Sequence, residues 1–185
     1  MKKIYAILLF IAAGIFYANA QIMATDLTDP TTEKLNLGVG IGFDYGTIGA
    51  NLLFYTQKNI GIFAGGGYNL MGFSYNAGLK GRFFVNETAA VVPFVTAMYG
   101  NNSTVIVKNM TNLNKAFYGP TFGAGVDWYV GGGIRKNYLS IALNVPVRGD
   151  EPEEYRTYLK NNHGVEFQNE FLPIGVSVGY RFRLK

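Results

Sequence analysis

The chain has 185 residues with a formal net charge of +4, which suits a single domain and gives no strong attraction for nucleic acid. It contains no cysteine, which excludes disulfides, thiolate metal sites and the amino-terminal cysteine that carries a bacterial lipid anchor. Only 15% of the residues are charged, against roughly 25% in ordinary soluble domains, so an exterior that faces lipid is indicated.

The amino-terminal segment predicts export from the cytoplasm. Lys2 and Lys3 are charged, residues 4–17 are apolar, and Ala18-Asn19-Ala20 follows, as in a secretory signal peptide. We therefore predict a signal peptide over residues 1–20 that is cleaved between Ala20 and Gln21. An uncleaved membrane anchor is the alternative, but the apolar run is short for a spanning helix. Residues 21–33 lack periodicity and contain an Asp-Pro pair, so we expect a flexible leader there.

From residue 34 onward, apolar residues alternate with polar or small ones, which is typical of β-strands with two unlike faces. The last segment, residues 172–184, shows this most clearly. The pattern predicts eight strands, at about residues 34–43, 47–56, 60–68, 73–85, 89–99, 116–128, 139–147 and 172–184. Asp44-Tyr45-Gly46 is predicted as a turn, and residues 100–115 and 148–171 are predicted as long loops.

These strands suit an all-β, eight-stranded antiparallel up-and-down transmembrane β-barrel over residues 34–185. Ten residues of about 3.3 Å, tilted by about 45°, rise about 23 Å, which is close to the apolar band of an outer membrane. No Asp, Glu, Lys or Arg occupies the apolar register of any predicted strand. A charge there costs about 2 to 4 kcal/mol at the bilayer midplane, so a lipid-facing outer surface is favoured. A soluble periplasmic barrel with an apolar ligand inside is the alternative.

The lengths of the connections predict an orientation. With both chain ends in the periplasm, the short turns at residues 57–59, 86–88 and 131–136 are periplasmic, and the two long loops are extracellular. Large aromatic residues of the apolar register fall near strand ends and predict two interfacial girdles. One girdle comprises Phe43, Tyr68, Phe73, Tyr99 and Tyr118, and the other comprises Phe54, Phe83, Trp128, Tyr180 and Phe182.

The opposite register must fill the narrow lumen of an eight-stranded barrel. Glycine, serine and asparagine supply space, and five charged residues form a predicted lumen charge cluster near the periplasmic end: Lys80, Arg82, Asp127, Arg181 and Arg183. Since Asp127 can neutralise one of the four cations, excess positive charge is expected. A structural network is one interpretation of this cluster, and a narrow anion-preferring pore is the other.

The last long loop contains a predicted short helix and the single histidine. Asp150 is a candidate N-cap with Glu153 three residues later and Pro152 near the start. Tyr155, Tyr158 and Leu159 share one face of this helix, and His163 follows in a predicted turn. The loop is acidic, which indicates either a solvated surface or, together with residues 100–115, a docking surface for an extracellular partner.

Cofactor motifs are missing from the sequence. Gly38-Val39-Gly40-Ile41-Gly42 lacks the spacing of a dinucleotide-binding loop, and no phosphate-binding loop occurs. No cofactor, metal or nucleic-acid partner is therefore predicted. Proline cannot donate to a strand ladder. The prolines of the predicted strands must therefore lie at bulges or at strand ends near the rim, or one predicted strand boundary is wrong: Pro93, Pro120, Pro146 and Pro173.

The end of the chain is similar to the carboxy-terminal assembly signal of outer-membrane barrels. Ser177 is followed by Gly179, and then by Phe182 and Leu184 at the fifth and seventh positions after Ser177, although the chain ends in Lys185 rather than an aromatic residue. The resemblance implies recognition by the barrel-insertion machinery. The chain after the signal peptide resembles small eight-stranded outer-membrane proteins, such as the PorT-like and OmpX-like proteins.

This resemblance implies a non-enzymatic outer-membrane protein of a Gram-negative cell, with a structural or surface-interaction role in its extracellular loops. Some eight-stranded barrels modify lipid A with a histidine, a serine and an acid near the outer rim. A lipid A-modifying enzyme that uses His163, Ser103 or Ser74 and an acid of the last loop is therefore an alternative, although no spacing in the sequence supports it.

Overall fold

A computed structural model describes residues 34–86, 88–108, 110–130, 137–167 and 169–184. The predicted signal peptide, the predicted leader and the turn at residues 131–136 lie outside these residues. No helix among the residues described is long and apolar enough to cross a membrane.

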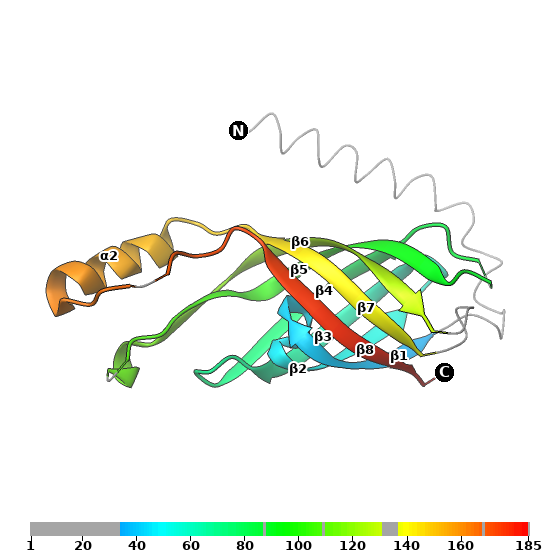
Figure 1. Cartoon of the computed structure of the whole chain (residues 1–185), viewed down its shortest axis with the longest axis horizontal. Helices are drawn as coiled ribbons and strands as arrows, with labels where there is room; N and C mark the ends of the chain where they lie inside the picture. The colour runs from blue at the N-terminus through cyan, green and yellow to red at the C-terminus, as the bar shows by residue number, and fades with distance from the viewer. Residues whose placement is uncertain (1–33, 87, 109, 131–136, 168, 185) are drawn as a thin grey trace, which may run out of the picture. The chain divides into compact units, whose positions relative to one another are not determined.

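Eight antiparallel strands form a closed barrel in which each strand pairs with its neighbour in sequence and β1 pairs with β8 (Figure 1). The predicted fold class is therefore confirmed. The strands are β1 (Leu35–Gly42), β2 (Thr47–Tyr55), β3 (Ile60–Tyr68), β4 (Phe73–Arg82), β5 (Val91–Val105), β6 (Lys115–Tyr129), β7 (Tyr138–Pro146) and β8 (Gly175–Arg183). Two short 3-10 helices, η2 (Phe43–Tyr45) and η3 (Thr111–Leu113), and one α-helix, α2 (Glu151–His163), lie in the connections.

We call the end of the barrel at which β1 begins and β8 ends the proximal rim, and the end that carries η2 and α2 the distal rim. Strand residues alternate between the outside and the lumen, as the period-two pattern predicts. The inward side chains are mainly polar or charged and buried, such as Asn51, Lys80 and Asp127. The outward ones are mainly large and apolar, such as Ile41 and Leu143. The barrel thus has its polar side chains inside and its apolar side chains outside.

The predicted loop at residues 100–115 is wrong for residues 100–105 and for residue 115, which lie in strands. β5 continues to Val105 and β6 begins at Lys115, so these two strands extend past their neighbours at the distal rim. β4 pairs with β5 only as far as Asn76 opposite Gly100, and β7 pairs with β6 only as far as Pro146 opposite Thr121. We call the protruding hairpin, residues 101–108 and 110–119, the arm.

The prediction failed there because a bulge between Asn101 and Ser103 interrupts the alternation. Asn101, Asn102 and Ser103 are consecutive and all buried, so no exposed apolar residues alternate with these polar ones. The polar sequence therefore has the composition of a loop although it forms a strand.

Two other strand boundaries differ from the prediction by three residues. β4 ends at Arg82 rather than at residue 85, because Phe84 has a φ of 54°, which ends the extended conformation. β8 begins at Gly175 rather than at residue 172, so Pro173 lies outside the ladder.

The prolines inside strands face the ends of shorter neighbours. The Pro93 carbonyl accepts from the Phe83 amide just past the end of β4, and the Pro120 carbonyl accepts from the Val147 amide just past the end of β7. The main-chain nitrogen and oxygen of one strand residue point to the same neighbouring strand. The N–H group that each proline lacks would therefore face the end of β4 or of β7, where pairing with that strand stops. Pro146 is itself the last residue of β7. Pro146 thus lies at a strand end as one alternative predicted, whereas Pro93 and Pro120 lie inside strands, opposite the end of a neighbour.

Helix α2 confirms the predicted helix, but two details of the prediction are wrong. The Asp150 side chain makes no capping hydrogen bond, and its carbonyl instead accepts from the Glu153 and Glu154 amides. His163 is the last helical residue rather than part of a turn, and Gly164 ends the helix with a φ of 62°.

Candidate functional sites in the lumen and beyond the distal rim

The β1–β2 connection folds into the lumen, which the sequence did not indicate. Residues 44–46 form a turn as predicted, although the turn begins one residue earlier at Phe43; Tyr45 is completely buried and Asp44 is 7% exposed. The Asn51 amide donates to the Asp44 carbonyl at 2.6 Å, and the Asn76 amide donates to the Phe43 carbonyl at 2.5 Å. The hydroxyl of Ser177 accepts from the Phe43 amide at 3.1 Å. Three strands thus hold η2 as a plug.

Glycines of β1 and β8 make room for the Tyr45 ring. A Cβ at Gly38 would lie 3.0 Å from the ring, one at Gly40 would lie 2.9 Å from it, and one at Gly179 would overlap the phenol oxygen. Any larger residue at Gly40 or Gly179 would have to displace the ring or the backbone. The glycine-rich stretch of β1 therefore forms part of a slot for an aromatic plug.

Arg181 links β8 to this plug. Its guanidinium donates to Asn51 Oδ1 at 2.8 Å and to Asp44 Oδ2 at 3.3 Å, and it lies over the Tyr45 ring at 5.5 Å. Arg181 is 2% exposed, so it needs these partners to offset its desolvation. The carboxylate of Asp44 is a lumen charge that the predicted cluster omitted, because its place in a turn gave no sign that it points inward.

Lys80 and Asp127 form the second buried ion pair, as the prediction allowed. Lys80 Nζ lies 2.8 Å from each Asp127 carboxylate oxygen, and the Ser140 hydroxyl donates to Asp127 Oδ1 at 2.7 Å. The ammonium also lies 3.6 Å from the centre of the Phe94 ring. A hydrogen-bonded ion pair with an aromatic face beside it is a stable way to bury this lysine.

Arg82 and Arg183 occupy the proximal end. Arg82 is buried, donates to the Tyr129 hydroxyl at 3.1 Å and to the Lys58 carbonyl at 2.8 Å, and stacks on the Tyr55 ring at 3.5 Å. Arg183 is the last residue of β8 and is only half-buried, so it belongs to the rim rather than to the buried cluster. The structure therefore brings four of the five predicted lumen charges inside.

Buried side chains fill the barrel along its length. Tyr45 occupies the lumen from the distal side, while Tyr55, Tyr129 and Tyr138 pack at the proximal end, where the last two rings lie 4.6 Å apart. Large side chains thus occupy the lumen at both ends, as expected for a barrel of eight strands.

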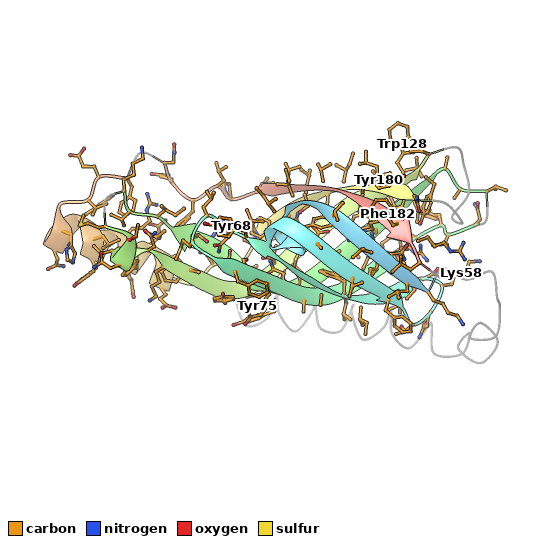
Figure 2. All side chains as sticks on the ribbon, turned by 90° about the horizontal axis from the view of Figure 1, so that it is seen from below. Lys58, Tyr68, Tyr75, Trp128, Tyr180 and Phe182 are labelled. Carbon is orange, nitrogen blue, oxygen red and sulfur yellow. The ribbon has the colours of Figure 1, made fainter. Side chains whose placement is uncertain are left out.

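The predicted girdle residues lie on the outer surface, with one exception (Figure 2). Tyr68, Tyr99 and Tyr118 are exposed toward the distal rim, and Tyr118 packs against Tyr75 at 5.3 Å. Phe54, Phe83, Trp128, Tyr180 and Phe182 are exposed toward the proximal rim. Phe43 is wrong as a girdle residue: η2 turns it inward, where it packs against a cluster of Leu53, Tyr55, Phe63 and Met98.

The residues of the resembled assembly signal lie in the wall of the barrel. The Ser177 hydroxyl, which contacts the Phe43 amide, also accepts from the Asn144 side chain at 2.8 Å, and Gly179 adjoins Tyr45. Phe182 and Leu184 are exposed on the outside. Ser177 and Gly179 thus have structural roles in seating the plug, and their role as an assembly signal stays a prediction.

Beyond the distal rim, the arm packs on α2 through a small apolar core. Val105, Val107, Phe117 and Leu159 are buried together, and Tyr155, Phe167 and Phe171 pack around them. The Tyr155 hydroxyl donates to the Leu113 carbonyl at 2.8 Å. We call the arm, α2 and residues 164–171 the distal module.

Two arginines fasten the distal module. Arg156 is 6% exposed, donates to the Asn169 carbonyl at 2.8 Å and to Glu153, and lies over the Phe167 and Phe171 rings. Arg148 donates to the Asn102 and Leu172 carbonyls. Burial lowers the pKa of Arg148, and the nearby Glu153 carboxylate opposes that shift.

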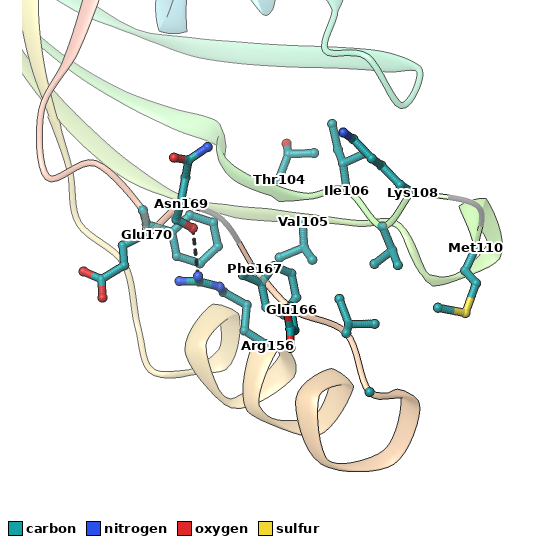
Figure 3. Close-up of a pocket in the computed structure, with 14 residues that line it drawn as sticks. Thr104, Val105, Ile106, Lys108, Met110, Arg156, Glu166, Phe167, Asn169 and Glu170 are labelled. Carbon is teal, nitrogen blue, oxygen red and sulfur yellow. Dashed lines mark hydrogen bonds between the residues drawn. The ribbon is translucent and has the colours of Figure 1, made fainter.

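A groove of about 550 Å³ lies between the arm and residues 164–171 (Figure 3). The partly buried Val165, Phe167 and Phe171 give it apolar walls, while Glu166 and Glu170 are exposed beside it. The predicted docking surface thus contains a groove, which the sequence did not reveal because its walls come from separate segments.

The residues of the enzymatic alternative do not converge. The His163 ring packs against Tyr158 at 5.6 Å, Ser74 is buried among the lumen residues, and no hydrogen bond joins His163 to Ser74 or Ser103 in the described part of the chain. No group of histidine and acidic residues that could hold a metal ion occurs among the described residues.

No protein-family model matches the chain, and no curated protein sequence matches it. Among solved structures, the chain is similar to the N-terminal β-barrel domain of OprF from Pseudomonas aeruginosa, with a TM-score of 0.46 and 12% sequence identity. The match covers 82% of this chain and 98% of that domain. Membership of the PorT-like or OmpX-like proteins stays a prediction.

Proposed function

We propose that the chain is an integral outer-membrane β-barrel whose distal module acts at the cell surface. The observation that carries the proposal is the inverted arrangement of the barrel, with exposed side chains such as Ile41 (59%), Phe122 (53%) and Leu143 (58%) on its outside. Apolar patches that encircle a protein are unfavourable in water, whereas lipid accepts them. Outside the arm, the outward register of the described strands carries no charged side chain.

The length and ends of the strands support this placement. β7 has nine residues, which at about 3.3 Å and a tilt of about 45° rise about 21 Å, near the height of the outer-membrane apolar band. Exposed aromatic residues near both rims suit the two interfaces of that band. The distal rim carries the longest connection of the barrel, between the end of β7 at Pro146 and the start of β8 at Gly175. The proximal rim is then periplasmic, and the distal module is extracellular. Insertion would depend on the barrel-insertion machinery, with lipid as the surrounding partner.

The other candidate functions have less support. An anion-preferring pore needs an open lumen, whereas Tyr45 and the proximal tyrosines fill it. A lipid A-modifying enzyme needs a histidine, a serine and an acid in contact, which the described residues do not provide. A soluble lipid-binding barrel needs an apolar lumen, whereas this lumen holds two ion pairs. We therefore propose a non-enzymatic, structural or surface-interaction role.

Migration on a denaturing gel tests the membrane placement. We expect the expressed protein in the outer-membrane fraction, with different mobility before and after heating because a folded barrel resists unheated detergent. Recovery in the soluble periplasmic fraction, with one mobility, would contradict the proposal.

A further inference from the structure

One edge of the arm carries main-chain groups that no neighbouring strand uses. The Pro120 carbonyl faces β7, so by alternation Phe117 and Lys115 direct their main-chain groups toward β5. Ser103 and Val105, which stand opposite them, direct theirs toward β6. Thr104 lies between these two, so its amide and carbonyl point away from β6, where β4 no longer pairs with β5.

The main-chain groups of Ile106, two residues further along the arm, also point to this open edge. The Val107 amide donates to Asn114 Oδ1 at 2.7 Å and its carbonyl accepts from Met110, so Val107 also faces the β6 side. Ile106 lies between Val105 and Val107, so its main-chain groups point to the open edge. In the part of the chain that the structure describes, no main-chain hydrogen bond uses the outward groups of Thr104 or Ile106.

The groove adjoins this open edge. Thr104 and Ile106 line it, and the partly buried Val165, Phe167 and Phe171 supply apolar surface. An edge of this kind pairs readily with another extended chain, and an adjacent groove can take every second side chain of that chain.

The charge around the groove indicates the chemistry of the partner. Residues 148–171 contain six carboxylates and three lysines or arginines. One of these cations, Arg156, is already bound to Glu153 and to the Asn169 carbonyl. Glu166 and Glu170 are exposed at the groove, and Lys108 is the one exposed cation among its described lining residues. The excess of negative charge favours a partner that carries lysine or arginine.

We propose that the open edge of the arm binds an extended, basic segment of another protein as an added β-strand. The main-chain groups of Thr104 and Ile106 pair with the segment, its apolar side chains enter the groove, and its basic side chains approach Glu166 and Glu170. This inference rests on the proposed surface role of the distal module and names its partner class.

A labelled nine-residue peptide, KVTVKVTVK, tests the proposal with the whole purified barrel in lipid nanodiscs. We expect saturable binding by fluorescence anisotropy. The same peptide with N-methyl groups on alternate amides, which cannot pair as a strand, should bind at least about tenfold more weakly. A peptide with glutamate in place of lysine should also bind weakly. Absence of saturable binding, or equal binding of the N-methylated peptide, would overturn the proposal without any change to the protein.

Protein variants locate the site. Ile106→Pro removes an edge donor that the arm does not use, and we expect it to weaken binding about tenfold, while Ile106→Val stays within about twofold of the wild type. Glu166→Gln with Glu170→Gln should weaken binding several-fold and reduce its salt dependence. Unchanged affinity in folded Ile106→Pro would contradict the assignment.

Two further results separate the possible failures. If the barrel is in the outer membrane but no peptide binds, only this inference fails, whereas peptide binding by a protein found in the soluble fraction would overturn the proposed function alone. Self-association of the wild type that Ile106→Pro abolishes, without peptide binding, would assign the edge to a second copy and overturn the proposal.

Discussion

Lys80 on β4 and Asp127 on β6 form a bidentate contact across the inner face of β5, with Lys80 Nζ 2.8 Å from both carboxylate oxygens. Both side chains are buried, at 1% and 0% exposure. Asp127→Asn leaves a buried ammonium without its counter-charge, so we expect the free energy of unfolding to fall by about 3 to 5 kcal/mol. Urea unfolding of the barrel in lipid vesicles, followed by tryptophan fluorescence, measures the change.

The double variant Lys80→Met with Asp127→Leu is the matched control. It removes both charges together, so its stability should lie much nearer that of the wild type. Equal stability of Asp127→Asn and the wild type would contradict a structural role for this pair.

Gly179 adjoins the Tyr45 ring, so the packing of the plug can be tested at one position. We expect Gly179→Ala to lower the free energy of unfolding by about 1 to 3 kcal/mol, because the added methyl group overlaps the phenol oxygen. Tyr45→Ala in the same chain should relieve the overlap, so the two changes should be non-additive in urea unfolding.

Gly81→Ala is the control for Gly179→Ala. A Cβ there would have its nearest neighbour, Val95 Cγ2, at 3.7 Å, which is an ordinary contact. A larger loss of stability for Gly81→Ala than for Gly179→Ala would contradict the claim that Gly179 makes room for the Tyr45 ring.

A charge on the outer surface distinguishes lipid from water as the surroundings. Leu143 lies near the middle of β7 and is 58% exposed. In a bilayer, Leu143→Arg should cost about 2 to 4 kcal/mol, whereas Val147→Arg just past the end of β7 should cost about 0 to 1 kcal/mol. Urea titration in vesicles measures both. If both variants change the free energy of unfolding equally and negligibly, the outer surface faces water rather than lipid.

The filled lumen predicts that the wild-type barrel does not conduct. We expect no single-channel steps in planar bilayers at neutral pH, because Tyr45 and the proximal tyrosines occupy the path. The Tyr45→Ala variant tests whether the plug alone is the block. Regular anion-selective steps from the wild type would restore the pore hypothesis.

Much of the barrel could be predicted from the sequence because each strand has two unlike faces. The alternation of Leu139, Ile141 and Leu143 with Ser140 and Asn144 is a local property, so the outside and the lumen follow from it directly. The burial of Lys80 and Asp127 could also be predicted, because both residues belong to the inward register of their strands. Their pairing required the register across β5, which alternation does not specify.

The plug could not be predicted because its partners are distant in the sequence. Asp44, Tyr45 and Gly46 have the composition of a turn, and they do form one. Their burial depends on glycines of β8 and on Arg181, more than a hundred residues away, so no local pattern reveals it. The omission of Asp44 and the misplacement of Phe43 have this common cause.

Labelling of introduced cysteines on intact cells tests the central claim, that the barrel spans the outer membrane with the distal module outside. The chain has no cysteine, so Lys160→Cys on α2 and Asn59→Cys in the β2–β3 turn each supply a single exposed thiol. A membrane-impermeant maleimide should label Lys160→Cys on intact cells, and should label Asn59→Cys only after the outer membrane is permeabilised. Labelling of both positions, or of neither, on intact cells would contradict the account.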